Sequence, residues 1–227
     1  MRPLAAVAIA LAILLAACGG GSSPASRPTA DDGSAAQTAA PLDDPRLTAA
    51  VLAEADDDPS LPGEYVDLPA IYGGPYPASA QHVTRDVDYV AERVGSPPVG
   101  GPHWGRSACG TDPVAAPPLC GPAPWGVYHA PWRPETLVHN MEHAGVVIWY
   151  NTADRDTIES LEDFAVEQLN ADRQLVLVPY PDMADDTVAI TTWSRRDMFP
   201  AEDLTIERLQ AFLDAHYCRF DPEGFCG

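Results

Sequence analysis

Two histidines and a glutamate lie close together in one short segment, and these residue types can bind a metal ion. His139 and His143 are four residues apart, with Glu142 between them. Residues at this spacing share one face of a helix, and they also share one face of a strand because the strand period is two. Imidazole is the commonest metal ligand in proteins. The segment therefore predicts half of a metal site, whichever element it forms.

A third imidazole, that of His103, follows a Gly-Gly-Pro turn. Glycine lets the backbone approach a ligand closely, and proline stiffens the turn that presents the histidine. Two ligands from one element and one from a stiff loop would form a three-imidazole site, which suits zinc or copper. His82 or Glu142 could supply a fourth ligand. The predicted metal ligands are His103, His139, His143 and His82.

Met141 and Glu142 are candidate additional ligands whose roles depend on the local structure. If the segment is extended, Met141 lies on the same side as the two histidines, and its thioether would favour Cu(I). If the segment is helical, Met141 points elsewhere and packs in the core. Glu142 is either an extra ligand or a partner that orients a ligating histidine.

The same segment matches the H-x-x-E-H motif of zinc proteases, in which the glutamate is the general base. That chemistry needs the motif inside a long helix. Here Ala144-Gly145 and a β-branched run follow at once, and they are expected to end any helix. We therefore predict no catalytic residue and keep a zinc-dependent hydrolase as an alternative.

Aromatic residues suggest a second alternative, a ligand- or partner-binding surface module without metal. Tryptophan and tyrosine side chains can line a sugar or peptide groove, or they can pack in the core. The candidates are Trp104, Trp125, Trp132, Trp149, Trp193, Tyr128 and Tyr150.

The first residues predict secretion and lipid anchoring. A positive start precedes an uncharged apolar run that is too short to span a membrane and is typical of a signal peptide. The run ends at Leu15-Ala16-Ala17-Cys18, which resembles a bacterial lipobox and implies cleavage before Cys18 and diacylglycerol on its sulfur. We expect residues 1–17 to be a lipoprotein signal peptide and the mature protein to lie on the extracytoplasmic face of the cell membrane.

The remaining chain divides into a tether and a folded domain. Residues 18–43 hold Cys18 and then small or polar residues that cannot build a core, so they predict a flexible linker. Residues 44–227 are long enough for one extracytoplasmic domain. The formal net charge of −20 argues against nucleic acid and anionic lipid surfaces as partners. The expected partners are the membrane, reached through the N-terminal lipid, and a protein that donates or accepts metal.

Five cysteines become four once Cys18 is lipidated, and an even number outside the cell predicts two disulfides. We favour Cys109–Cys120 and Cys218–Cys226, because each pair closes a short loop that contains proline or glycine. A thiolate metal ligand near His103 is the alternative. Oxidation of free thiols outside the cell argues against it.

Hydrophobic periodicity predicts regular elements after residue 144 and fewer before it. Early in the chain we expect a helix at 45–58 capped by Asp44, a strand around 88–90 and a long, ordered Pro/Gly-rich loop at 95–134. Strands are expected at 145–150, 175–178 and 187–193, and amphipathic helices at 154–169 and 205–216. This order predicts a single α+β domain, a small mixed β-sheet with two or three helices packed on one face.

Four segments resemble motifs of one bacterial family: His82-Val83, 97–103, 137–147 and 191–195. They are similar to motifs of the domain of unknown function 3105 family, found largely in secreted or membrane-anchored proteins with no settled activity. The resemblance covers about residues 64–224. The sequence departs from those motifs at Val99-Gly100, Ala144 and Ser194, and no departure removes a histidine.

These features favour a membrane-anchored extracytoplasmic lipoprotein that binds copper or zinc through histidines, with copper slightly preferred. Its role would be sequestration or delivery of the metal at the cell surface. We expect His129 and His216 to be peripheral to the site.

Overall fold

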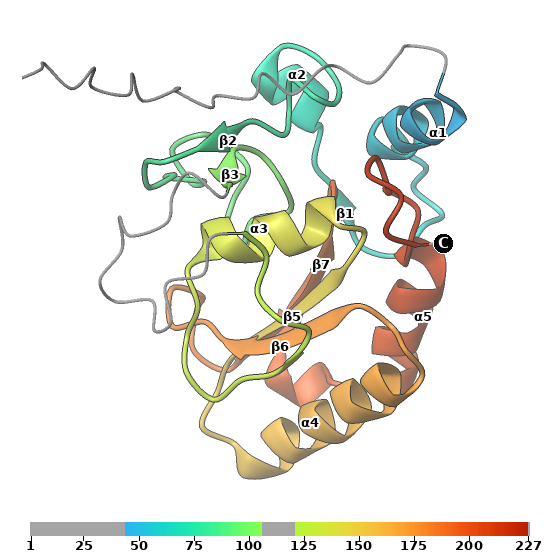
Figure 1. The fold of residues 1–227 in the computed structure, drawn as a ribbon. Helices are drawn as coiled ribbons and strands as arrows, with labels where there is room; N and C mark the ends of the chain where they lie inside the picture. Colours follow the sequence, from blue (N-terminus) through green and yellow to red (C-terminus); the bar gives the residue numbers. More distant parts are fainter. Residues whose placement is uncertain (1–43, 106–120, 227) are drawn as a thin grey trace, which may run out of the picture. The chain divides into compact units, whose positions relative to one another are not determined.

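The computed structural model describes residues 44–105 and 121–226, all of which belong to one compact unit, Ala39–Gly227. This unit is a single α+β domain, as the periodicity predicted (Figure 1). The predicted signal peptide and the linker up to residue 43 lie outside the described residues, as do Cys109 and Cys120.

A six-stranded mixed sheet forms the centre of the domain. Its order is β1-β8-β7-β5-β6-β4, with β5, β6 and β4 parallel and the remaining neighbours antiparallel. The strands are β1 (Glu64–Tyr65), β4 (Gly126–Val127), β5 (Val146–Asn151), β6 (Leu175–Pro179), β7 (Thr187–Thr192) and β8 (Arg195–Pro200).

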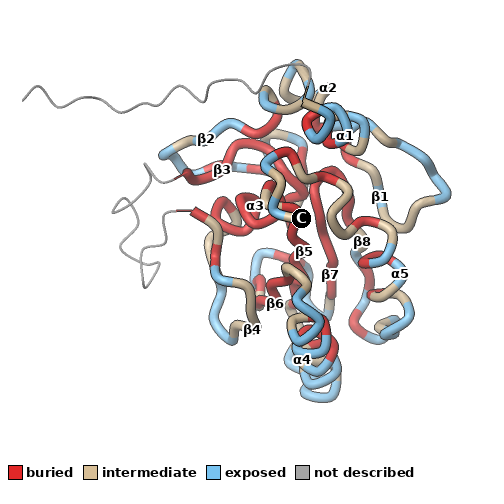
Figure 2. The backbone as a smooth tube through the Cα atoms, turned by 45° about the vertical axis from the view of Figure 1, so that its right-hand side comes forward, coloured by how far each residue is buried: buried red, intermediate tan, exposed pale blue. Residues whose placement is uncertain are grey.

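Helices cover both faces of this sheet, so the expectation that they cover one face is wrong. Val147 and Trp149 of β5 pack in a cluster with helix α3 (Pro134–Glu142). Alternate β5 residues pack in a second cluster with α4 (Arg155–Asn170) and α5 (Ile206–His216). Strand β5 is apolar without interruption because it is buried on both faces, and such a strand needs apolar residues at every position. Figure 2 shows the resulting burial of β5 and β7.

Two helices and a second sheet lie before α3. Helix α1 (Pro45–Glu54) is capped by the Asp44 side chain, and a short helix α2 is formed by Leu68–Tyr72. Strands β2 (His82–Val83) and β3 (His103–Trp104) make a two-stranded parallel sheet. A 3₁₀ turn, η2 (Ala201–Asp203), follows β8.

The strand predicted around residues 88–90 is not present. The Asp88 carbonyl accepts a hydrogen bond from Glu92 N, and the Asp88 side chain accepts one from Ala91 N. An aspartate that bonds local backbone N–H groups favours a turn over a strand ladder. Within the described part of the Pro/Gly-rich segment, β3 and β4 are the strands that form.

Helix α3 ends abruptly after Glu142. Ala144 takes a left-handed φ of 65°, Ala144 N bonds Met141 O at 3.1 Å, and Gly145 N bonds Asn140 O at 3.0 Å. These bonds form a Schellman motif, which satisfies the last helical carbonyls and turns the chain into β5. His143 is the C-cap residue, as expected of a helix that stops before the β-branched run.

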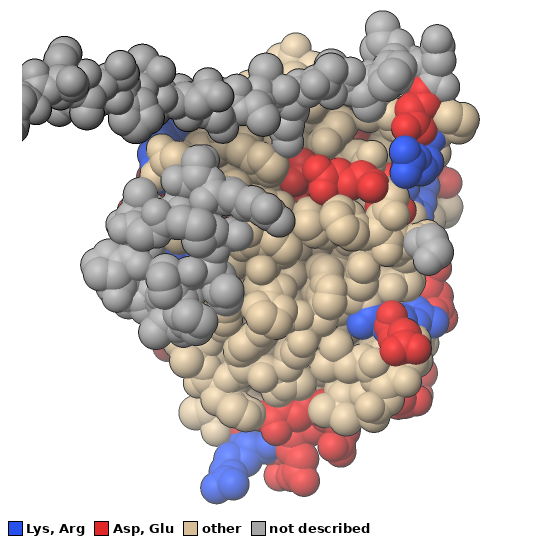
Figure 3. All heavy atoms as spheres, viewed as in Figure 1, with Lys and Arg blue, Asp and Glu red and all other residues tan. Residues whose placement is uncertain are grey.

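The described residues contain no helix that is long and apolar enough to cross a membrane. Figure 3 shows one face of the described domain, where acidic side chains gather over α4 and uncharged side chains cover much of the remaining surface.

Candidate metal centre

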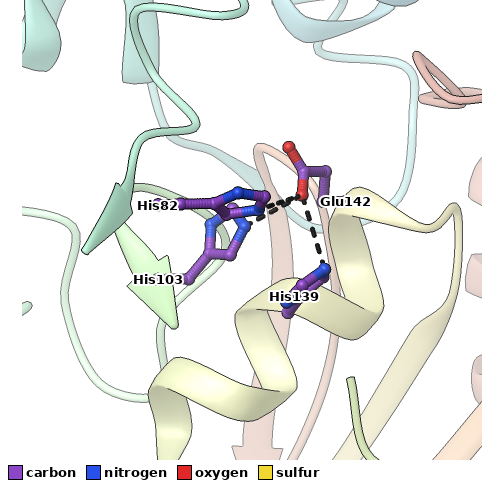
Figure 4. Close-up of side chains that lie close together, drawn as sticks. All are labelled: His82, His103, His139 and Glu142. Atoms are coloured by element: carbon purple, nitrogen blue, oxygen red, sulfur yellow. Dashed lines mark hydrogen bonds and ion pairs between the residues drawn. The ribbon is translucent and has the colours of Figure 1, made fainter. Parts of the chain in front are cut away.

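Three imidazoles and one carboxylate converge between the small sheet and helix α3 (Figure 4). His82 comes from β2, His103 from β3, and His139 and Glu142 from α3. Glu142 Oε2 lies 2.9 Å from His103 Nε2, 3.3 Å from His82 Nε2 and 3.9 Å from His139 Nε2. The four donor atoms lie within 4.8 Å of one another, so the group could hold a metal ion.

Two features of the fold bring these side chains together. The parallel register pairs His82 directly with His103, which places both side chains on the same face of the small sheet. His139 and Glu142 are three residues apart in α3 and therefore share one face of that helix. Helix α3 packs against β3, which closes the group.

Backbone carbonyls orient two of the imidazoles. His103 Nδ1 lies 2.9 Å from Gly101 O, and His139 Nδ1 lies 2.7 Å from Trp104 O. A carbonyl oxygen only accepts, so each Nδ1 carries a hydrogen and donates it. In the neutral tautomer, His139 Nε2, which lies 3.9 Å from Glu142 Oε2, directs a lone pair into the group, while His103 Nε2 donates a hydrogen bond to Glu142 Oε2 at 2.9 Å. Metal-binding histidines use this arrangement to fix the ring and its tautomer.

The electrostatics of the group favour neutral imidazole at His139 and a charged carboxylate at Glu142. Burial, helped by His103, lowers the pKa of His139 to about 3. Burial alone would raise the pKa of Glu142, but the charge and hydrogen bond of His103, together with His82, hold that pKa well below its usual range. The hydrogen bond to Glu142 raises the pKa of His82.

The residues present fit a divalent cation. Glu142 is fully buried, and among the described residues its Oε1 has no hydrogen-bond partner. A buried charge needs a partner of opposite sign, and a buried oxygen needs a donor or a metal. A set of three imidazole nitrogens and one carboxylate oxygen matches the ligands of zinc and of copper(II).

His143 is placed differently from the other three predicted ligands. Its Nε2 lies 3.1 Å from Glu223 Oε2, and its ring stacks on Phe225 with centroids 4.0 Å apart. It falls in a second group that could hold a metal, made of Glu142, His143 and Glu223. Glu223 is not among the residues that the sequence predicts as ligands. The sequence signal that could have pointed to Glu223 is the predicted Cys218–Cys226 disulfide. This disulfide is present in the structure, and Glu223 lies in the loop that it closes.

The helical form of the segment decides the role of Met141. Met141 is fully buried and packs in the apolar cluster with Leu137 and Val138. The thioether is therefore in the core.

The remaining histidines have other partners. His129 is exposed and pairs with Glu162 at 3.4 Å. His216 is buried, and its Nε2 donates to Pro62 O at 2.8 Å. Neither belongs to a described group that could hold a metal.

Most of the candidate groove aromatics pack in or against the core. Trp104, Trp149, Trp193 and Tyr150 are buried, while Trp125 and Tyr128 are partly buried against the core cluster. Trp132 also lines a surface cavity of about 870 Å³ together with Arg133 and Tyr180. The aromatic residues therefore do not form one continuous groove in the described structure.

Comparison with known proteins identifies one family. The model of the family described as Protein of unknown function (DUF3105) matches residues 82–225, beginning at His82 itself. No curated protein and no solved structure matches the chain. The match covers more than half of the 227 residues and includes every member of the histidine–glutamate group. The chain belongs to the DUF3105 family of proteins of unknown function.

Proposed function

We propose that this protein is a membrane-anchored extracytoplasmic lipoprotein that binds a divalent transition metal, zinc or copper(II), for sequestration or delivery. The ligands are His82, His103, His139 and Glu142. One observation carries the proposal: His103 and His139 donate Nδ1–H to backbone carbonyls while their Nε2 atoms face the same buried carboxylate. Loss of the hydrogen that His103 Nε2 donates to Glu142 would leave both Nε2 lone pairs free for a cation.

The donor set favours a divalent ion over Cu(I). Soft sulfur ligands select Cu(I), whereas imidazole and carboxylate suit Zn(II) and Cu(II). Met141, the sulfur donor nearest in sequence, is buried in the apolar core. Zinc and copper(II) are therefore the ions to test first.

This geometry supports a metal-binding function better than a zinc-dependent hydrolase. Three histidines and Glu142 would fill the four positions of a tetrahedral ion, whereas catalytic zinc keeps one position for water. Glu142 Oε2 lies 2.9 Å from His103 Nε2, and this closeness supports a ligand role for the carboxylate. In the protease motif, that glutamate would instead be the general base.

The N-terminal sequence supports a role at the cell surface. The lipobox-like Leu15–Cys18 segment would supply the lipid anchor, and residues 19–43 would hold the domain away from the membrane. His82 is the exposed member of the ligand group, so exchange with a metal-donating or metal-accepting protein would begin at this histidine.

Metal content tests the proposal directly. Protein purified without a histidine tag should contain zinc or copper near or above one ion per chain, or take it up tightly on titration. The double variant His103→Ala/His139→Ala should bind zinc or copper at least about 100-fold more weakly. Loss of a residue that only supports a ligand weakens metal binding by up to about 100-fold, so loss of two ligands should exceed this. His129→Ala, outside the group, should bind normally. No zinc or copper and no tight uptake by the folded protein would refute the proposal.

A further inference from the structure

A second set of possible ligands lies beside the first and shares Glu142 with it. Glu142, His143 and Glu223 each offer one donor atom, and these atoms lie within 4.8 Å of one another. His143 follows Glu142 directly in the chain. The imidazole rings of His139 and His143 have centroids 4.7 Å apart, so the two groups are adjacent.

The C-terminal loop holds Glu223 in this position through several contacts. Cys218 and Cys226 form a disulfide across the loop. The Asp221 carboxylate accepts hydrogen bonds from Phe225 N and Cys226 N at 2.8 and 3.0 Å. Phe225 then stacks on the ring of His143. Glu223 is therefore part of a cross-linked, hydrogen-bonded loop that packs on the end of α3.

Glu142 has the unused donor capacity that a second cation requires. Its Oε2 faces the three histidines of the first group, and its buried Oε1 has no hydrogen-bond partner among the described residues. A carboxylate can give one oxygen to each of two cations. Two-metal sites in proteins place the ions about 3.5–4 Å apart.

We propose that Glu142, His143 and Glu223 form a second divalent-cation site and that Glu142 bridges the two ions. This inference rests on the proposed function, because the bridge requires the first ion. The second site has two carboxylates and one imidazole, one protein ligand fewer than the first, and His143 and Glu223 are less buried than His103 and His139. It therefore binds its ion more weakly and releases it first.

Stoichiometry in the full-length protein tests the second site, with zinc alone as the first probe. The wild-type chain should bind two zinc ions, the second more weakly. His143→Ala and Glu223→Gln should each bind one. Glu223→Gln keeps the size of the side chain, so it remains informative if His143→Ala disturbs the end of α3. The surface pair His129 and Glu162 provides matched controls, because His129→Ala and Glu162→Gln remove the same residue types elsewhere.

Copper(II) supplies an independent readout. Two copper(II) ions about 4 Å apart across one carboxylate should couple magnetically, and both second-site variants should show only an isolated copper signal. One ion in the wild type and in every variant would overturn the second site and leave the first intact, with His143 and Glu223 forming an ion pair only. No ion in any of these proteins would overturn both proposals.

Discussion

At the scale of single residues, backbone carbonyls prepare the site as much as the histidines do. The carbonyls of Gly101 and Trp104 accept Nδ1–H from His103 and His139, which fixes both rings before any ion binds. Such preorganisation reduces the entropy lost on binding.

Gly105 keeps the space that His82 occupies. A Cβ on Gly105 would lie 2.9 Å from His82 Cγ, closer than real contacts allow. Gly105→Ala should displace the imidazole and weaken zinc binding by about 10-fold or more, the range seen when support for a ligand is lost. Gly126→Ala is the matched control, because nothing lies within 4 Å of its added Cβ. Equal zinc affinity for both variants in a chelator competition would show that His82 is not a ligand.

His216 should make stability depend on pH. Burial lowers the pKa of His216 to about 4 from 6.5, so the unfolded chain binds more protons between these values. Stability therefore falls as the pH falls through that window, by at most about 1.4 kcal/mol per pH unit from this group. Urea unfolding of metal-free protein from pH 7 to pH 4 should show a shallower loss in His216→Gln. Identical slopes would contradict the assignment.

Three of the four predicted ligand histidines come together in one group, and the fourth lies beside it. His82, His103 and His139 converge with Glu142, while His143 pairs with Glu223. The four-residue spacing predicted that His139 and His143 lie near each other. It did not predict which other side chains each imidazole would contact. Glu223 could not be predicted from spacing, because only the folded loop brings it to α3.

At the scale of elements, the end of α3 controls where His143 and Glu142 lie. Ala144 adopts a φ of 65°, a left-handed conformation that glycine takes without strain. Ala144→Gly should therefore raise the free energy of unfolding by about 1 kcal/mol. The same change in the middle of a helix, at the exposed Ala49 of α1 (Ala49→Gly), should lower it by about 1 kcal/mol. Urea unfolding measures both, and a loss of stability in Ala144→Gly would contradict the capping account.

Periodicity predicted the elements in which apolar residues repeat and missed those without such a repeat. Strands β5, β6 and β7 and helices α4 and α5 were predicted closely because apolar residues repeat in each of them. Strand β8 was missed, since Arg195, Arg196 and Asp197 break any apolar alternation. Strands β2 and β3 are two residues long, too short for a period to appear.

At the scale of the whole molecule, the site depends on contacts between distant parts of the chain. The parallel pairing of His82 with His103 and the packing of α3 on β3 join segments that periodicity treats separately. The histidine spacing and the family resemblance suggested which residues would meet. The pairing that unites them required the fold, because a two-residue parallel strand carries no sequence signal of its own.

The N-terminus should anchor the whole protein without affecting the metal site. Cys18→Ala removes the proposed lipidation residue, so the chain should no longer incorporate labelled fatty acid and should leave the membrane fraction. Zinc affinity should stay unchanged, because the ligands lie in the folded domain. Fractionation with a fatty-acid label checks this. Retention of the variant in membranes, with label incorporated, would contradict the anchor.

The most direct test of the central claim is the position of zinc in crystals of the zinc-loaded protein, located by anomalous scattering at the zinc edge. The account predicts a peak about 2.0–2.1 Å from the Nε2 atoms of His82, His103 and His139, with a Glu142 oxygen at about 2.0–2.2 Å. Zinc-loaded crystals with no peak inside this group, or with zinc bound only elsewhere, would contradict it.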